Sequence, residues 1–160
     1  MYILIIIAVL LYILGYIVKY INSNKNITIN ENCYLPKMNP MTETEKTFLS
    51  YLKHFTDKYN LIILPQVQLQ SIFKLSNNKD ITSFNKIKSK SVDFAIVDNK
   101  YNYKLFIELD DYTHNPKNRI ERDSFVNNLF NTYNLKLRRI KAQKNYDLEL
   151  IENIIKEVVN

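Results

Sequence analysis

Hydrophobic and polar residues alternate along two neighbouring stretches of the chain, residues 92–97 and 105–110. Successive side chains of a β-strand point to opposite faces, so this two-residue period predicts two strands. The short polar segment that separates them predicts the turn of a β-hairpin. Pairing outward from this turn places Asp93 across from about Leu109 or Asp110.

The remaining pattern predicts a mixed α/β domain with helices before and after the hairpin. Apolar residues at helical spacing mark the helices, and short apolar runs mark the strands. The expected elements, in chain order, are a helix opened by the capping box of Thr42 and Glu45, a strand at 61–64, a short helix at 81–87, the hairpin, a helix at 118–133, a strand at 135–140 and a helix at 147–158 that Asp147 caps.

The first eighteen residues carry no charged side chain and are almost all apolar. A helix of this length spans roughly 27 Å, close to the ~30 Å hydrocarbon core of a bilayer. The pattern predicts a transmembrane anchor at 1–21, a juxtamembrane linker at 22–40 and a folded domain at 41–160. Lysines after the apolar run favour a single-pass membrane protein whose C-terminal domain is cytoplasmic. A cleaved signal peptide is disfavoured, because the start carries no positive charge and no small-residue cleavage site follows.

The composition narrows the classes of function. The formal net charge is +6, and the first eighteen residues contribute none of it, so the folded part is basic. A basic surface favours nucleic acid or an anionic membrane surface as a partner. The single cysteine, Cys33, cannot form an intrachain disulfide, and a single glycine excludes a glycine-rich phosphate-binding loop.

The expected hairpin gathers three acidic residues, Asp93, Glu108 and Asp110, at one end of the sheet. Like charges at close range repel, so such a cluster needs a cation. Carboxylate oxygens suit Mg²⁺ and Mn²⁺, which makes the three residues candidate metal ligands. Glu108 is the strongest candidate, because it lies within an otherwise apolar run where an unpaired carboxylate is costly.

A histidine and basic residues flank the acidic cluster in the sequence. His114 follows Asp110 by four residues and is a candidate to position the attacking water. Lys90, Arg119 and Arg122 are candidates to bind the substrate phosphate, and Arg122 also to stabilise its charge. A metal-assisted phosphodiesterase site needs these residue types. The structural alternative is that the carboxylates are solvated strand-end residues and the lysines form a solvated face.

Other acidic residues are expected to have structural roles. Asp98 and Asp111 are expected in turns, and Asp123 is expected in an early turn of a helix, where a negative charge favours the helix dipole. Glu45 is expected to cap its helix, with a place in the site as the secondary interpretation.

Three segments carry a resemblance to a known family: K-S-V-D-F at 90–94, I-E-L-D-D-Y-T-H at 107–114 and R-I-E-R-D-S-F at 119–125. Together with shorter segments, the resemblance covers about residues 40–150 in order. The chain resembles the bacterial family labelled domain of unknown function 2726 (DUF2726). This resemblance places it with the restriction-endonuclease-like, PD-(D/E)XK nucleases, near the very-short-patch-repair-type endonucleases.

The resemblance implies an α/β fold with a restriction-endonuclease-like α-β-β-β-α-β core and a mixed sheet. It implies that Asp93 and Glu108 bind the metal. Two positions depart from the pattern of the group, because Asp110 stands where a lysine is usual and Val92 where a proline is usual. The proton-handling residue is therefore open, and His114, or Arg122 as a charge stabiliser, is the candidate to substitute.

The sequence thus predicts a membrane-anchored, metal-dependent nuclease that hydrolyses phosphodiester bonds, with DNA preferred to RNA and Mg²⁺ or Mn²⁺ as cofactor. A homodimer is allowed, because many nucleases of this fold work as dimers. Two alternatives stay open: a nuclease-fold module that binds nucleic acid without catalysis, which the missing lysine motivates, and a membrane-tethered domain that binds another protein.

Overall fold

The computed structural model describes residues 2–23, 33, 35–77, 79–110 and 116–159. The chain divides into two compact units, Met1–Met38 and Asn39–Asn160, and each is described by itself. The acidic residues of the expected site all belong to the second unit.

Among the described residues of the first unit, 2–23 form the helix α1 (Tyr2–Ser23), whose described apolar side chains are exposed. Over the part of the chain that the structure describes, no helix has the length and apolar character needed to cross a membrane. The expected anchor at 1–21 and the single-pass membrane localisation are therefore wrong. The uncharged run ends at Lys19, and the last turn of α1 carries Asn22 and Ser23, whereas a span needs about 20 predominantly apolar residues.

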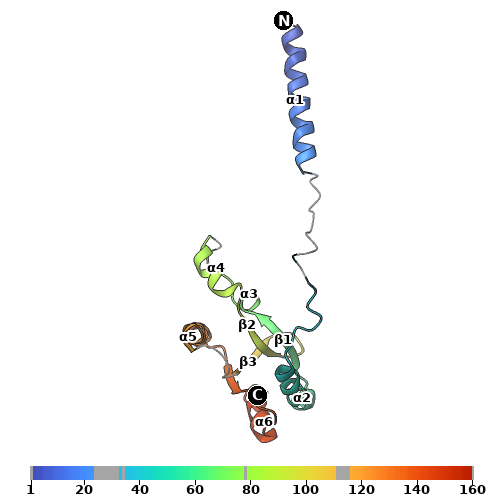
Figure 1. The fold of residues 1–160 in the computed structure, drawn as a ribbon. Coiled ribbons are helices and arrows are strands. Elements are labelled where there is room, and N and C mark those ends of the chain that lie inside the picture. Colours follow the sequence, from blue (N-terminus) through green and yellow to red (C-terminus); the bar gives the residue numbers. More distant parts are fainter. Residues whose placement is uncertain (1, 24–32, 34, 78, 111–115, 160) are drawn as a thin grey trace. The chain divides into compact units, whose positions relative to one another are not determined.

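The second unit is built on a four-stranded sheet of β1 (Ile62–Gln68), β2 (Ser91–Val97), β3 (Tyr103–Asp110) and β4 (Leu137–Lys141). The strands lie in the order β1-β2-β3-β4 (Figure 1). The first three pair antiparallel, and β4 lies parallel to β3. The mixed sheet expected from the sequence is therefore present.

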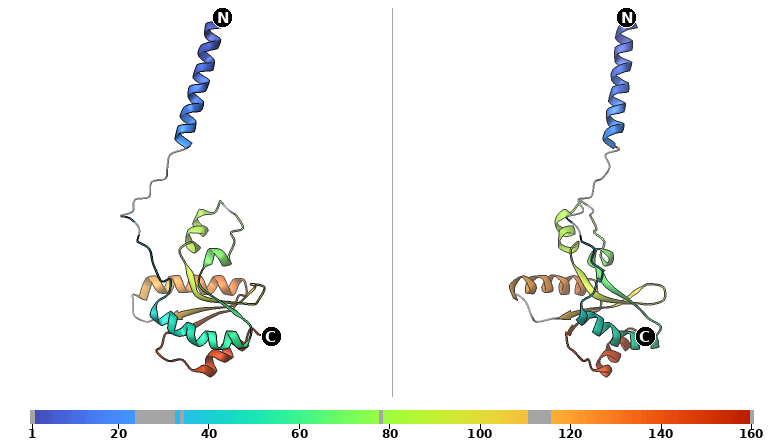
Figure 2. Two further views of the ribbon diagram at one scale, coloured as in Figure 1. Left: turned by 90° about the vertical axis from the view of Figure 1, so that its right-hand side faces the viewer. Right: turned by 45° about the vertical axis from the view of Figure 1, so that its right-hand side comes forward.

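The described helices of this unit are α2 (Glu43–Lys58), α3 (Leu69–Ile72), α4 (Ile81–Ile87), α5 (Pro116–Thr132) and α6 (Leu148–Lys156). In the left view of Figure 2, α5 covers one face of the sheet, and α2 and α6 cover the other face. The short helices α3 and α4 connect β1 to β2 and extend beyond these strands (Figure 1).

Local signals explain where two helices begin. The Glu45 carboxylate accepts the backbone N–H of Thr42 at 2.6 Å, and the Thr42 hydroxyl accepts the N–H of Glu45 at 3.3 Å, which is the expected capping box. Asp147 caps α6 as expected by accepting the N–H of Glu149 at 2.9 Å. β1 is longer than expected because it continues through Pro65, which an edge strand tolerates.

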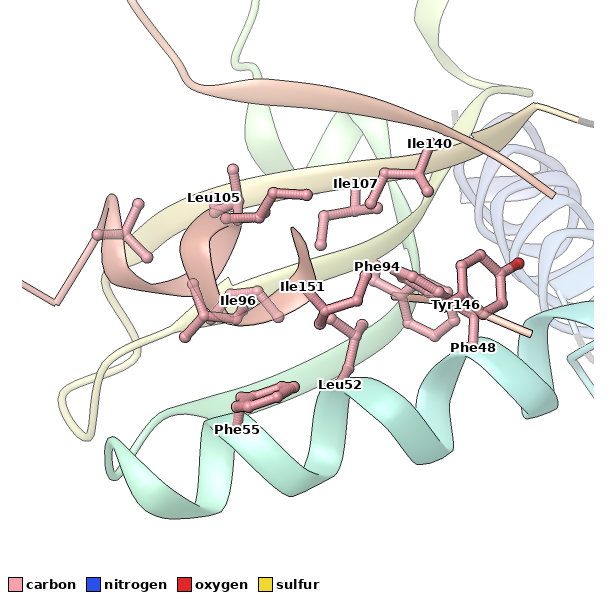
Figure 3. Close-up of a cluster of buried hydrophobic side chains, with 13 residues drawn as sticks. Phe48, Leu52, Phe55, Phe94, Ile96, Leu105, Ile107, Ile140, Tyr146 and Ile151 are labelled. Carbon is pink, nitrogen blue, oxygen red and sulfur yellow. The ribbon is translucent and has the colours of Figure 1, made fainter. Parts of the chain in front are cut away.

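The core has two clusters, one on each face of the sheet. The expected hairpin is present, with Phe94 opposite Ile107, and both side chains enter the cluster between the sheet and helices α2 and α6 (Figure 3). A second cluster, on the α5 face, includes Phe106 and Phe130. Fully burying side chains of this size stabilises the fold by roughly 1.5–3 kcal/mol each. The two apolar layers hold β2 and β3 in a defined register.

Candidate active site

Two acidic side chains, Asp93 and Glu108, lie near each other on the adjacent strands β2 and β3, since the charge of Asp93 raises the pKa of Glu108. Phe94 of β2 and Ile107 of β3 are paired and belong to the cluster between the sheet and helices α2 and α6. Glu108, the next residue of β3, therefore points toward α5. Asp93, the next residue toward the start of β2, is acted on by Glu45 of α2 and by Arg122 of α5. Asp93 and Glu108 lie at the end of the hairpin away from its turn, where the sequence places them.

Asp93 is tied to the neighbouring strand by its side chain. Its Oδ2 atom accepts a hydrogen bond from the backbone N–H of Leu109 at 2.7 Å. Continuing the register in which Phe94 lies opposite Ile107 puts Asp93 across from Glu108, one residue before the expected Leu109. Burial raises the pKa of Asp93 to about 6; the Leu109 N–H and the Arg122 charge oppose this rise, and the Glu45 carboxylate adds to it. Asp93 therefore changes charge close to neutral pH.

Glu108 is the only acidic side chain that is buried among the residues that the structure describes, with 5% of the residue exposed. Burial raises its pKa to about 7; Arg139 and Arg122 oppose the rise, while Asp93 and Asp123 add to it. Its Oε1 atom has no hydrogen-bond partner within the described ranges. Such an atom is costly in a folded protein, and it is expected where a ligand binds.

Arg139 of β4 brings a positive charge to the acidic residues. Parallel pairing puts it beside Glu108, and its Nη2 lies 2.5 Å from Glu108 Oε2 and 3.4 Å from Asp123 Oδ1. Its Nη1 donates to Asp110 Oδ1 at 3.0 Å, and its Nε donates to Asn127 Oδ1 at 3.0 Å. The Nη2 contacts are ion pairs without hydrogen-bond geometry, so this buried nitrogen, like Glu108 Oε1, has no hydrogen-bond partner in the described part of the chain.

A further carboxylate approaches the site from the start of α2. Glu45 Oε1 accepts a hydrogen bond from Gln66 Nε2 at 2.9 Å, and its charge acts on Asp93. Gln66 has a φ of 52°, and it is the one residue within a described strand that adopts this left-handed conformation. Non-glycine residues adopt it at a cost, and such strain recurs at functional sites. Glu45 therefore combines its expected capping role with a place beside the acids.

The acidic residues suit a metal ion that is shared with a substrate. Within the described residues, no group of three or more histidine, cysteine or acidic side chains is placed to hold a metal. Mg²⁺ is commonly held by one or two carboxylates together with water and substrate phosphates. Asp93 and the partnerless Oε1 of Glu108 fit this mode. Asp110 is engaged by Arg139 instead.

One of the expected phosphate-binding residues lies near the acids. Arg122 is exposed on α5, and its charge lowers the pKa of both Asp93 and Glu108, which places it near them. Lys90 lies three residues before Asp93. Its Nζ donates to the Lys86 carbonyl at 2.5 Å and lies 5.5 Å from the centroid of the Phe125 ring. These contacts place the Lys90 side chain beside α4 and α5.

Some expectations fall outside the described residues. His114 and Asp111 are not among them, and the side chain of Arg119 is not described either, so their roles stay predictions. Asp98 is a turn residue as expected, because its Oδ1 accepts the backbone N–H groups of Lys100 and Asn102, both at 2.9 Å.

Two residues of the site have roles that were not predicted from the sequence. Arg139 was expected only to flank the last strand; its alternation with the buried Ile140 was the signal that it faces α5. Asp123 was expected in an early turn of its helix, where a negative charge favours the helix dipole. It lies in α5 about two turns after the start at Pro116, and its ion pair with Arg139 was not predicted.

Comparison with known proteins identifies a family. A sequence model of the family described as "Protein of unknown function (DUF2726)" matches residues 37–158. The match covers most of the chain, which therefore belongs to this family. No curated protein and no solved structure was found to be significantly similar to the chain.

Proposed function

We propose that this member of the DUF2726 family is a metal-dependent nuclease of the restriction-endonuclease-like, PD-(D/E)XK group, related to the very-short-patch-repair-type endonucleases, and that it hydrolyses phosphodiester bonds of DNA or RNA. The observation that carries the proposal is the buried Oε1 atom of Glu108, which lacks a hydrogen-bond partner among the described residues. A second carboxylate with a raised pKa, Asp93, lies on the adjacent strand. The net charge of +6 suits a polyanionic substrate.

Each residue of the site has a distinct role in this proposal. Asp93 and Glu108 hold Mg²⁺ or Mn²⁺ with the substrate phosphate; the bound ion supplies charge stabilisation and lowers the pKa of its water. Arg139 holds Glu108 through Oε2 and leaves Oε1 for the ligand. Arg122, whose charge acts on both acids, stabilises negative charge on the phosphate.

Binding of the ion also involves protons. Asp93 and Glu108 have pKa values of about 6 and 7 without the ion, so a part of each is protonated near neutral pH. Metal ligands must be deprotonated, and occupation of the site therefore releases protons. The raised pKa values predict that the affinity for the ion falls as the pH decreases through this range.

A second candidate function is binding of nucleic acid without catalysis. Arg139 pairs with Glu108, Asp110 and Asp123, and a guanidinium in this place partly replaces the charge of a metal ion. This candidate predicts salt-dependent binding of nucleic acid that neither requires Mg²⁺ nor leads to cleavage.

A cleavage assay distinguishes the two functions. The full-length protein is incubated with labelled single-stranded and double-stranded DNA and RNA, in Mg²⁺, Mn²⁺ or EDTA. The matched variants are Glu108→Gln and Glu149→Gln; Glu149 is an exposed acidic residue in the first turn of α6. We expect cleavage that requires the metal, falls by at least about 100-fold in Glu108→Gln and persists in Glu149→Gln.

Three results contradict the proposed nuclease. Binding of the same nucleic acids without cleavage in either metal supports the second candidate. Cleavage that survives in both glutamine variants removes Glu108 from the reaction. Cleavage that is equally fast in EDTA removes the metal ion from it.

A further inference from the structure

A pocket of about 460 Å³ lies between the α3–α4 connection and α5, and the proposed chemistry does not use it. Phe73 and Lys74 line it from the α3–α4 connection, Lys86 lines it from α4, and Phe125 and Tyr133 line it from α5 and the residue just after α5. A second pocket of about 450 Å³ shares Phe73 and Lys74 and is also lined by residues of α4. The two hollows therefore adjoin each other.

Aromatic rings form the walls of the larger pocket. The ring of Phe73 is held edge-on against buried Phe130, with centroids 5.2 Å apart at 89°, and lies 5.7 Å from the ring of Tyr133. Tyr133 is nevertheless 63% exposed, so much of its surface is open to a ligand. Exposed aromatic faces of this kind stack on nucleobases, which is worth about 1–3 kcal/mol per base.

Lysines line and flank the same pocket. Residues 69–90 contain five lysines and one acidic residue, which gives this segment a formal charge of +4. The acid, Asp80, also lines the pocket, and hydrogen bonds from the Ser83 hydroxyl and the Ser83 N–H hold its carboxylate and lower its pKa. An occupant that complements both the aromatic walls and the lysines carries an aromatic group and negative charge.

The pocket is connected to the acidic site through two elements. Along α5, Asp123 pairs with Arg139 in the acidic site, and Phe125, two residues later, lines the pocket. Lys90 contacts the Phe125 ring and directly precedes the strand that carries Asp93. At 1.5 Å per residue, α5 covers roughly 14 Å from Asp123 to its end, a few nucleotides of a strand.

We propose that this pocket binds an unpaired nucleobase of a nucleic-acid strand, with Tyr133 and Phe73 stacking on the base and Lys74 and Lys86 binding the neighbouring phosphates. The direction of the strand toward the acids rests on the proposed nuclease function, whereas base binding does not require catalysis. The substrate class is therefore nucleic acid with a single-stranded segment beside the bond that is cleaved.

The test measures binding by fluorescence anisotropy in EDTA, where metal-dependent cleavage cannot occur. The probes are labelled strands of about 12 nucleotides, one of deoxythymidine, one of uridine and one abasic strand with the same phosphates, together with a duplex of equal length. The full-length protein is expected to bind the strands with bases at least about fivefold more tightly than the abasic strand and the duplex.

Matched variants assign the effect to the pocket. Tyr133→Asn is compared with Tyr101→Asn, since Tyr101 is 66% exposed in the hairpin turn and lies outside both pockets. We expect Tyr133→Asn to weaken binding of the strands with bases about fivefold and to leave abasic binding unchanged, while Tyr133→Phe and Tyr101→Asn bind normally. Lys86→Gln should weaken binding of all the single strands, unlike Lys100→Gln in the turn.

The outcomes separate this inference from the proposed function. Base-dependent binding through Tyr133 without any cleavage supports the pocket and contradicts the nuclease. Metal-dependent cleavage with equal affinity for normal and abasic strands supports the nuclease and overturns the pocket. A third outcome also overturns the proposed base-binding pocket. If an acidic peptide displaces the strands, and Tyr133→Asn does not change the affinity for the strands, the occupant of the pocket is a peptide.

Discussion

The two ends of the β2–β3 hairpin hold aspartate and glutamate residues in opposite environments. At the turn, Asp98 accepts backbone N–H groups and the side chain of Asn102, and these hydrogen bonds lower its pKa to about 2. At the other end, burial raises the pKa of Asp93 to about 6 and that of Glu108 to about 7. The carboxylate anion is therefore stabilised at the turn and destabilised at the opposite end of the hairpin.

This difference separates a structural carboxylate from a functional one. The Asp98 oxygens complete a turn, so the charged form contributes to folding. Glu108 keeps an oxygen without a hydrogen-bond partner among the described residues, and its charge opposes folding. A costly buried carboxylate beside a second one is the arrangement expected of a binding or catalytic site.

The largest effect on stability is expected from removing the positive charge at the acidic end. Arg139→Ala leaves Glu108, Asp110 and Asp123 without this guanidinium. Breaking a largely buried ion pair in this way should lower the free energy of unfolding by about 3 kcal/mol, measured by urea denaturation in EDTA at pH 8. The control Arg138→Ala, which removes an exposed pair with Glu157, should cost less than about 1 kcal/mol. An equal loss in the free energy of unfolding for Arg139→Ala and Arg138→Ala would contradict the special role of the acidic end.

A smaller effect of opposite sign is expected from Glu108→Gln. The pKa of this carboxyl rises from 4.5 to about 7 on folding, so between these pH values the folded state binds more protons than the unfolded state. The stability of the wild type therefore falls as the pH rises through this window, and the loss is complete above the folded pKa. The variant lacks this loss and should be more stable than the wild type at pH 8, by on the order of 2 kcal/mol.

The pH dependence provides the check on that variant. Urea denaturation in EDTA at several pH values should show the advantage of Glu108→Gln shrinking toward zero near pH 4, where both chains are uncharged at this position. A variant that is less stable than the wild type at pH 8 would mean that the Arg139 ion pair outweighs the burial of Glu108.

Stabilisation by a metal ion is expected to depend on the acidic end of the hairpin and not on its turn. At pH 8, Mn²⁺ above its dissociation constant should raise the free energy of unfolding of the wild type by about 1–3 kcal/mol, and by less at pH 5, where Asp93 and Glu108 are mostly protonated. Asp93→Asn should abolish this gain, whereas Asp98→Asn should retain it. A gain that persists in Asp93→Asn would place the ion elsewhere.

The smallest effect is expected at the turn. Asp98→Asn keeps an acceptor for the backbone N–H groups but removes the charge that they and Lys104 stabilise. Because the folded pKa lies below the ordinary value, the contribution of Asp98 is present above that ordinary value and is lost as the pH falls toward 2. The variant should therefore have a slightly lower melting temperature at pH 7 and an unchanged one near pH 2.

The sequence predicted the elements whose signal is local. The alternation in β2 and β3 and the capping box of Thr42 and Glu45 depend on neighbouring residues, and the structure confirms both. The alternation also placed Asp93 and Glu108 at the same end of the hairpin, and the hydrogen bond from Leu109 to Asp93 lies at that end. The pairing of β3 with β4 joins residues distant in the chain, and the role of Arg139 beside Glu108 follows only from that parallel register.

One expectation failed because local composition was given too much weight. The uncharged run in α1 suggested a membrane span, yet the described part of the chain has no helix suited to one. The ion pair of Asp123 with Arg139 was not predicted, because a contact between α5 and β4 is not visible from the local pattern.

Cleavage by matched variants at the two ends of the hairpin tests the central claim most directly. Labelled nucleic acid in Mn²⁺ is incubated with the full-length wild type, Asp93→Asn and Asp98→Asn. We predict that Asp98→Asn cleaves at nearly the wild-type rate and that Asp93→Asn, although folded, cleaves at least about 100-fold more slowly. Equal cleavage by the two variants would show that the buried acids do not form the active site.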